Sequence, residues 1–138
     1  MTAPLGKLTF LYVGTSDLDR DLEYYTKVLG AKLLWNYHEF GAKVASVRLS
    51  DGPQFILADH RKAPSVLPIF EVKDLKATAK DLRSRGWKAE GRSFEIPPGP
   101  CHVFKDPSGN ELAFFENARP GLMETSFGDA DIRRSRRK

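Results

Sequence analysis

The chain has 138 residues, a hydrophobic content of 41% and a formal net charge of +4, which suits one ordinary globular domain with a buried core. No apolar run reaches the roughly 20 residues of a membrane-spanning helix, and the single cysteine, Cys101, excludes an internal disulfide framework. The N-terminus also lacks a basic start followed by an apolar run. We therefore expect a cytoplasmic protein with no membrane partner.

The positive charge is concentrated at the C-terminus. Five basic residues lie within positions 133–138 and outweigh the whole net charge, so the body of the chain is close to neutral. A terminal basic cluster without apolar periodicity is typical of a solvated tail. We predict a C-terminal extension over residues 119–138, with a short turn of helix or strand near 122–127. Nucleic acid is not an expected partner.

The first elements along the chain are a strand over Leu8–Val13 and a helix that ends at Gly30. Ser16, with Asp19 three residues later, has the spacing of a capping box. Apolar residues then recur on one helical face, at Leu18, Leu22, Tyr25 and Leu29. Alternating apolar residues predict three further strands, over Lys32–His38, Lys43–Leu49 and Gln54–Asp59.

The second half of the chain repeats this order. A strand over Leu67–Val72 leads to a helix that is capped by Asp74 and ended by Gly86. Further strands are predicted over Trp87–Ala89, Cys101–Lys105 and Glu111–Glu116. Prolines lack the amide donors of a sheet, so segment 96–100 is predicted to be a loop at a rim. Each half is β-α-β-β-β, which indicates a two-copy duplication.

Three motifs occur in a fixed order on these elements. They are Ser16-Asp17-Leu18 leading to Leu29-Gly30, the segment Phe70–Leu75, and the turn Phe104–Asn110. Together they resemble the vicinal oxygen chelate superfamily, which includes glyoxalase I, bleomycin resistance proteins and extradiol dioxygenases. The resemblance implies an α+β domain over residues 1–118, with modules at about 5–60 and 66–118. Their curved mixed sheets would enclose a central cavity, with the helices on the convex side. The resemblance also implies a homodimer.

Metal-dependent members of that superfamily hold a divalent ion in the cavity on up to four His, Glu or Gln side chains. The resemblance assigns these positions to Phe10, Leu67, Ala113 and either Ile56 or Leu57, all of them apolar. We therefore expect no metal and no other cofactor. The interpretation is a metal-independent protein that binds a small organic molecule, as bleomycin resistance proteins do. The alternative is an enzyme of the superfamily, a glyoxalase-like lyase or dioxygenase, with a displaced metal or metal-free acid/base catalysis.

The candidate ligand-binding residues lie on strands that the resemblance directs toward the cavity. They are Phe10, Tyr12, Trp35, Tyr37, Leu67, Glu71, His102, Glu111 and Ala113. An inward carboxylate must be paired or meet a ligand, and Arg48 is an available partner for Glu71 or Glu111. Only one of the adjacent pair Cys101 and His102 can face the cavity. No residue is assigned a catalytic role, because no third group fixes the roles of the two carboxylates.

Overall fold

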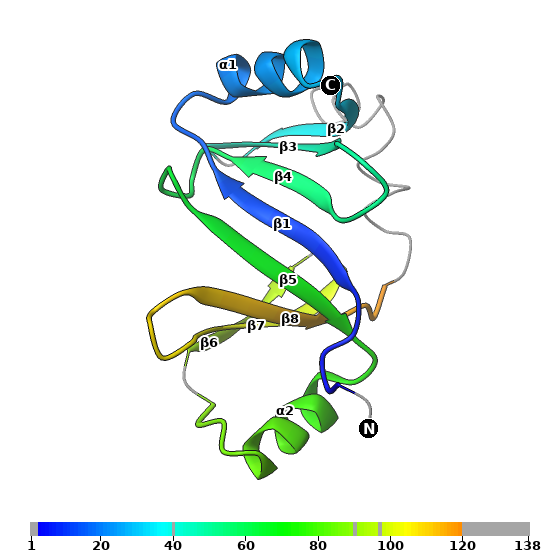
Figure 1. Ribbon diagram of the computed structural model, residues 1–138, viewed down its shortest axis with the longest axis vertical. Helices are drawn as coiled ribbons and strands as arrows, with labels where there is room; N and C mark the ends of the chain where they lie inside the picture. Colours follow the sequence, from blue (N-terminus) through cyan, green and yellow to red (C-terminus); the bar gives the residue numbers. More distant parts are fainter. Residues whose placement is uncertain (1–2, 40, 90, 97, 120–138) are drawn as a thin grey trace.

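A computed structural model describes residues 3–39, 41–89, 91–96 and 98–119 of the chain. These residues form one eight-stranded sheet with helices on its outer side (Figure 1). The strands are Leu8–Gly14 (β1), Lys32–Glu39 (β2), Ala42–Arg48 (β3), Gln54–Ala58 (β4), Val66–Val72 (β5), Arg92–Ile96 (β6), Gly99–Lys105 (β7) and Glu111–Glu116 (β8). Except for residue 119, the predicted C-terminal extension lies outside the described residues.

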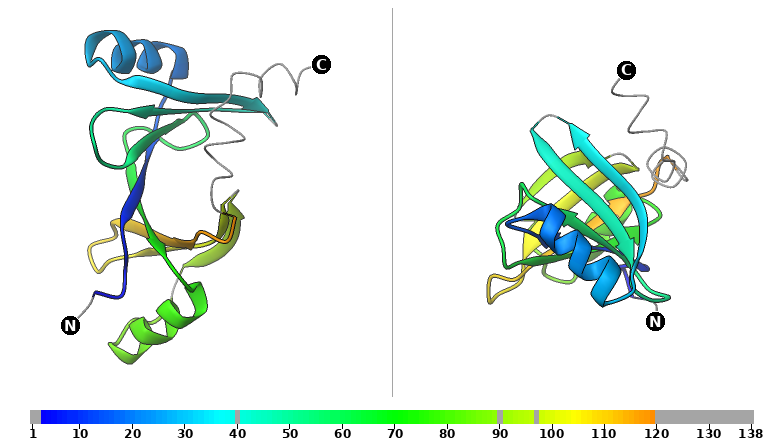
Figure 2. Two further views of the ribbon diagram at one scale, coloured as in Figure 1. Left: turned by 90° about the vertical axis from the view of Figure 1, so that its right-hand side faces the viewer. Right: turned by 90° about the horizontal axis from the view of Figure 1, so that it is seen from above.

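The sheet consists of two similar halves joined at its centre. The strand order is β2-β3-β4-β1-β5-β8-β7-β6. Within each half the first strand runs parallel to the last, β1 to β4 and β5 to β8, and the remaining neighbours are antiparallel. The sheet curves into an open C shape whose two halves face each other across its concave side (Figure 2). This confirms the predicted α+β fold of two β-α-β-β-β modules.

The helices cover the convex side of the sheet. They are α1 (Leu18–Glu23), which continues into the π-helical segment η1 (Tyr24–Val28), and α2 (Leu75–Ser84). Leu18 of α1 packs against Leu57 of β4, and Ala79 of α2 packs against Phe114 of β8. The concave side is left free for a separate buried cluster. Among the described residues, no helix has the length and apolar character needed to cross a bilayer.

The two helix starts test the capping predictions. The N-cap of α1 is Asp17, one residue beyond the predicted Ser16, and its carboxylate accepts the backbone N–H of Arg20 at 3.1 Å. Both residue types can cap a helix, but the Ser16 hydroxyl accepts a hydrogen bond from the Arg20 guanidinium instead. In α2 the predicted cap is confirmed, because Asp74 accepts the N–H of Ala77 at 3.0 Å.

The prediction of a strand at Trp87–Ala89 was wrong. Trp87 packs against Phe114 with ring centroids 5.8 Å apart, on the side of the sheet that α2 covers. Ala89 has a φ of 58°, a left-handed conformation that interrupts an extended run. The strand that follows α2 is β6, which begins only at Arg92.

The proline-rich segment 96–100 is also more regular than predicted. Ile96 is the last residue of β6, and Gly99 and Pro100 are the first two residues of β7. Pro100 lies opposite Glu95 in the β6–β7 hairpin. A proline is tolerated there because β8 pairs with β7 only from Cys101 onward.

Candidate functional site

The positions that the superfamily resemblance assigns to metal ligands lie together on the concave side. Phe10, Leu67, Ala113 and Ile56 belong to one buried cluster, and none is more than 5% exposed. Leu57 lies on the opposite face, in the cluster beneath α1. Because adjacent residues of a strand point to opposite faces, Ile56 is the residue of β4 that faces inward.

An apolar cavity of about 260 Å³ lies against this cluster. Its wall is made of Phe10, Tyr12, Trp35, Tyr37, Val44, Ile56, Leu67, Ile69, Phe94, Ile96, Pro98 and Cys101. The first four residues and Leu67 are predicted ligand-binding residues. Ala113 is fully buried in the adjoining core and is not part of the wall. Alternation along β3, β5 and β6 was the only sequence signal that could have added Val44, Ile69 and Phe94.

Tyr12 brings a polar group to the wall of the apolar cavity. Its hydroxyl shares a hydrogen bond of 2.6 Å with Nε2 of His60, an exposed residue in the loop after β4. Burial raises the pKa of Tyr12 from 10.0 to about 12, against the lowering effect of the nearby Arg61 charge. Tyr12 therefore stays a neutral phenol at physiological pH and can donate or accept a hydrogen bond.

Glu111 forms an ion pair, but with a different arginine from the predicted one. Its Oε1 lies 2.7 Å from Nη2 of Arg61, and the two side chains are 33% and 17% exposed. Arg48 instead donates a hydrogen bond to the carbonyl of Gly52, at 2.9 Å. The Arg61–Glu111 pair connects the loop after β4 with β8, and so links the two halves of the sheet near Tyr12.

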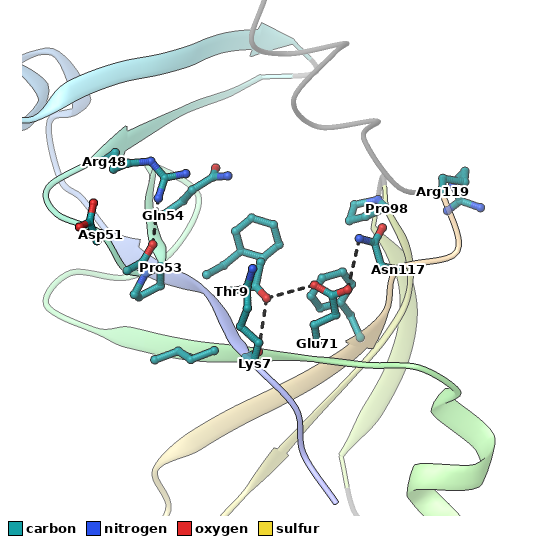
Figure 3. Close-up of a pocket in the computed structure, with 14 residues that line it drawn as sticks. Lys7, Thr9, Arg48, Asp51, Pro53, Gln54, Glu71, Pro98, Asn117 and Arg119 are labelled. Atoms are coloured by element: carbon teal, nitrogen blue, oxygen red, sulfur yellow. Dashed lines mark hydrogen bonds between the residues drawn. The ribbon is translucent and has the colours of Figure 1, made fainter.

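A second, polar pocket of about 550 Å³ adjoins the apolar cavity (Figure 3). The two share Phe10 and Pro98. The polar pocket is lined by Lys7, Leu8, Thr9, Phe10, Arg48, Asp51, Gly52, Pro53, Gln54, Glu71, Pro98, Phe115, Asn117 and Arg119. Its charged side chains come from the segment before β1, the end of β3, the β3–β4 turn, the end of β5 and the segment after β8. The apolar cavity and the polar pocket are therefore adjacent.

Glu71 lies in the wall of the polar pocket. Its two carboxylate oxygens accept weak hydrogen bonds of 3.4 Å, one from the Thr9 hydroxyl and one from the Asn117 amide. Among the described residues no cationic side chain lies within salt-bridge distance of Glu71. This carboxylate is therefore held by neutral donors beside the cavity.

The expectation that His102 faces the cavity was wrong. His102 lies on the convex side, where its ring stacks on Phe114 with centroids 5.8 Å apart. Its Nδ1 lies 2.7 Å from the Ser93 hydroxyl. The neighbouring Cys101 is the inward residue: it is 1% exposed and forms part of the cavity wall. Burial raises the pKa of the Cys101 thiol from 9.0 to about 12.

The sequence of the chain matches that of a known family. Residues 7–114 match the sequence profile of the Glyoxalase/Bleomycin resistance protein/Dioxygenase superfamily. The chain belongs to this superfamily. No curated protein matches its sequence.

Solved structures share the fold of this superfamily member at low sequence identity. Methylmalonyl-CoA epimerase from Mycobacterium tuberculosis is 20% identical, with a TM-score of 0.69 over 86% of this chain and 92% of that one. A methylmalonyl-CoA epimerase in complex with methylmalonyl-CoA and NH4+ is 17% identical, with a TM-score of 0.61 over 83% and 96%. A superfamily member from Vibrio splendidus 12B01 is 12% identical, with a TM-score of 0.59 over 78% and 96%. At these identities the likeness shows the fold alone.

The residues of this superfamily member do not fit the divalent ion of the metal-dependent relatives. Phe10, Ile56, Leu67 and Ala113 offer no nitrogen or oxygen side-chain donor, and such an ion needs several to offset its dehydration. Within the described part of the chain, no three His, Cys, Asp or Glu side chains are grouped so that they could hold a metal ion.

The raised pKa of Cys101 predicts a thiol of low reactivity. A thiol with a pKa of about 12 instead of 9.0 has about 1,000-fold less thiolate at pH 8. We expect iodoacetamide to modify native Cys101 at least 100-fold more slowly, as a rough bound, than the urea-unfolded chain, as followed by mass spectrometry. A Ser108→Cys variant places a control thiol in the exposed turn before β8, and it should react at the ordinary rate. Equal rates for native Cys101 and this control would contradict the buried placement.

Proposed function

We propose that this superfamily member binds a small organic molecule with a flat apolar body, without using a metal ion. The observation that carries the proposal is the chemistry of the four positions that the resemblance assigns to metal ligands. All four are apolar and pack in one cluster with the wall of the apolar cavity. Sites for organic ligands are mostly apolar, with a few polar groups that orient the ligand. The Tyr12 hydroxyl and the adjoining polar pocket supply such groups.

The dimensions of the site suggest the size and affinity of a simple probe. Ligand sites commonly enclose about 300–1,000 Å³, so the apolar cavity of about 260 Å³ suits a body of one or two rings. Burying roughly 200 Å² of apolar ligand surface contributes about 5 kcal/mol, and the loss of ligand freedom offsets part of it. We expect dissociation constants between about 0.2 mM and 10 mM for such a probe.

The first test is a matched pair of valine variants. Val44 lines the apolar cavity, whereas Val66 is 53% exposed and lies outside it. We expect 2-naphthylmethanol to bind the protein with one-to-one stoichiometry in isothermal titration calorimetry. Val44→Phe fills cavity space and should weaken binding by about tenfold or more. Val66→Phe adds the same atoms elsewhere and should leave binding unchanged. Equal binding by both variants would place the ligand outside the cavity.

The second test concerns metal. Elemental analysis of protein purified without chelator should find no stoichiometric divalent ion, and EDTA treatment should leave the binding of 2-naphthylmethanol unchanged. A stoichiometric ion whose removal abolishes binding would overturn the proposal. It would indicate instead that the superfamily's metal chemistry uses a displaced site.

A second candidate function is metal-free acid/base catalysis, and the placement of Glu71 favours it. This carboxylate lines a pocket that adjoins the apolar cavity and has no ion-pair partner in the described part of the chain. A carboxylate so placed could remove a proton next to a carbonyl group. Two structural relatives are methylmalonyl-CoA epimerases, so methylmalonyl-CoA in heavy water is a suitable first substrate. Deuterium incorporation that is lost in Glu71→Gln would support the enzyme over the binding protein.

A further inference from the structure

We infer that the ligand is an amphipathic acid, with its ring in the apolar cavity and its carboxylate in the polar pocket near Lys7, Arg48 and Gln54. The inference rests on the proposed function and adds the chemical class of the ligand. It starts from adjacency: Phe10 and Pro98 line both spaces, so a ligand that fills the apolar cavity lies at the border of the polar pocket.

The strongest single observation is the side chain of Gln54. It is only 7% exposed and lines the polar pocket. Its Oε1 accepts a hydrogen bond from the hydroxyl of the fully buried Ser46, with an O–O distance of 2.7 Å. This bond fixes the orientation of the Gln54 amide. The Nε2 donor has no partner among the residues that the structure describes. The Nε2 atom is not fully buried, so it opens on the pocket and can donate to a ligand oxygen at this end of the site.

Two cationic side chains line the same pocket as Gln54. The Lys7 ammonium makes no ion pair within the described part of the chain. Arg48 donates one hydrogen bond to the carbonyl of Gly52 and likewise has no acidic partner there. Figure 3 shows Arg48 and Gln54 on one side of the pocket and Glu71 on the other, with Lys7 at the strand between them. Both cations can therefore receive an anion that reaches Gln54.

The acidic side chains of the pocket determine where the anion lies. Glu71 is held by Thr9 and Asn117 on the wall of the second half, and Asp51 is exposed in the β3–β4 turn. Arg119, on the same side as Glu71, is already bonded to Glu95 at 2.9 Å. Asp51 lies on the same side as Arg48 (Figure 3), but it is exposed and is outnumbered there by Lys7 and Arg48, so the ligand carboxylate is assigned to that side, with Glu71 across the pocket.

Three naphthalene probes that differ only in charge test the assignment. They are 2-naphthoate, 2-naphthylmethanol and 2-naphthylmethylammonium, titrated by calorimetry at pH 7. We expect the anion to bind about tenfold more tightly than the alcohol, and the cation to bind most weakly. Raising the NaCl concentration from about 0.05 M to 0.5 M should weaken the binding of 2-naphthoate but not that of 2-naphthylmethanol, because salt screens the partly exposed cationic side chains.

Matched variants then locate the charge. Lys7→Met keeps the aliphatic chain but removes the ammonium. It should lower the affinity for 2-naphthoate by about threefold to tenfold and leave the affinity for 2-naphthylmethanol unchanged. Lys80→Met makes the same change of net charge on the exposed face of α2 and should have no effect. Glu71→Gln should strengthen binding of the anion.

The outcomes separate this inference from the proposed function. Equal affinity for all three probes, or a preference for the cation, would overturn the inference that the ligand is an acid. The proposal that the cavity binds a small molecule would still stand. A preference for the anion that survives Lys7→Met and high salt would also overturn it. Failure of all three probes to bind would remove the proposed function and the inference together.

Discussion

Ala113→Glu is expected to lower the free energy of unfolding at pH 7 by about 3 kcal/mol or more, as measured by urea denaturation. Ala113 is fully buried in β8, between Ile69 of β5 and Val103 of β7. A glutamate there restores the residue type of metal-dependent relatives, but it adds volume to a packed core. It also places a carboxylate among apolar side chains, where burial disfavours the charged form.

The matched control is Ala113→Gln, which adds a similar volume without charge. Burial raises the pKa of the new carboxyl above its unfolded value of about 4.3. The extra penalty of the glutamate is therefore absent below that unfolded value and grows as the pH rises toward the folded value. We expect the two variants to be equally stable near pH 4 and to diverge toward pH 7. Zinc should not rescue Ala113→Glu, since Phe10, Ile56 and Leu67 still offer no donors. A zinc-dependent rise in stability would contradict the placement of these residues.

Local signals explain why the fold could be predicted from the sequence. Asp74 caps α2 as predicted, and the glycines at which the two helices were predicted to end, Gly30 and Gly86, have φ values of 75° and 106°. These left-handed conformations suit glycine and end a helix. Phe10 and Leu67, two of the positions that the resemblance assigned, fell on the inner face, since side chains alternate along most of each strand.

The prediction failed where no local signal fixed which residues of a strand face inward. β7 begins at Gly99, inside a proline-rich segment, so the sequence could not decide whether Cys101 or His102 faces inward. The choice between Ile56 and Leu57 was open for the same reason, since both are apolar. In each case the packing of neighbouring strands decides the face, and packing is a property of the whole sheet.

Long-range pairings were the other part that the sequence could not supply. Glu111 is fifty positions from Arg61, and both Arg48 and Arg61 have the right charge to pair with it. The polar pocket is likewise assembled from five separate segments of the chain. Lys7 and Gln54 belong to no motif, and only the fold brings them to one end of the cavity.

Phe115→Ala is expected to lower the free energy of unfolding by about 3 to 5 kcal/mol. The Phe115 side chain is 1% exposed, and its ring centroid lies 5.5 Å from that of Phe10. Removing the ring leaves a void beneath the site, which the surrounding sheet can close only in part. Urea denaturation measures the loss directly, and the variant should retain the circular dichroism of the fold if enough stability remains.

Phe94→Ala is the control, because it removes the same ring from a different environment. Phe94 is 39% exposed and stands in the wall of the apolar cavity, with the Arg92 guanidinium 5.6 Å from its ring. We expect less than about 1 kcal/mol of destabilisation from this change, together with weaker binding of 2-naphthylmethanol. Equal destabilisation by the two variants would mean that Phe94 belongs to the core. The expected difference instead separates a ring that holds the sheet together from one that is available to a ligand.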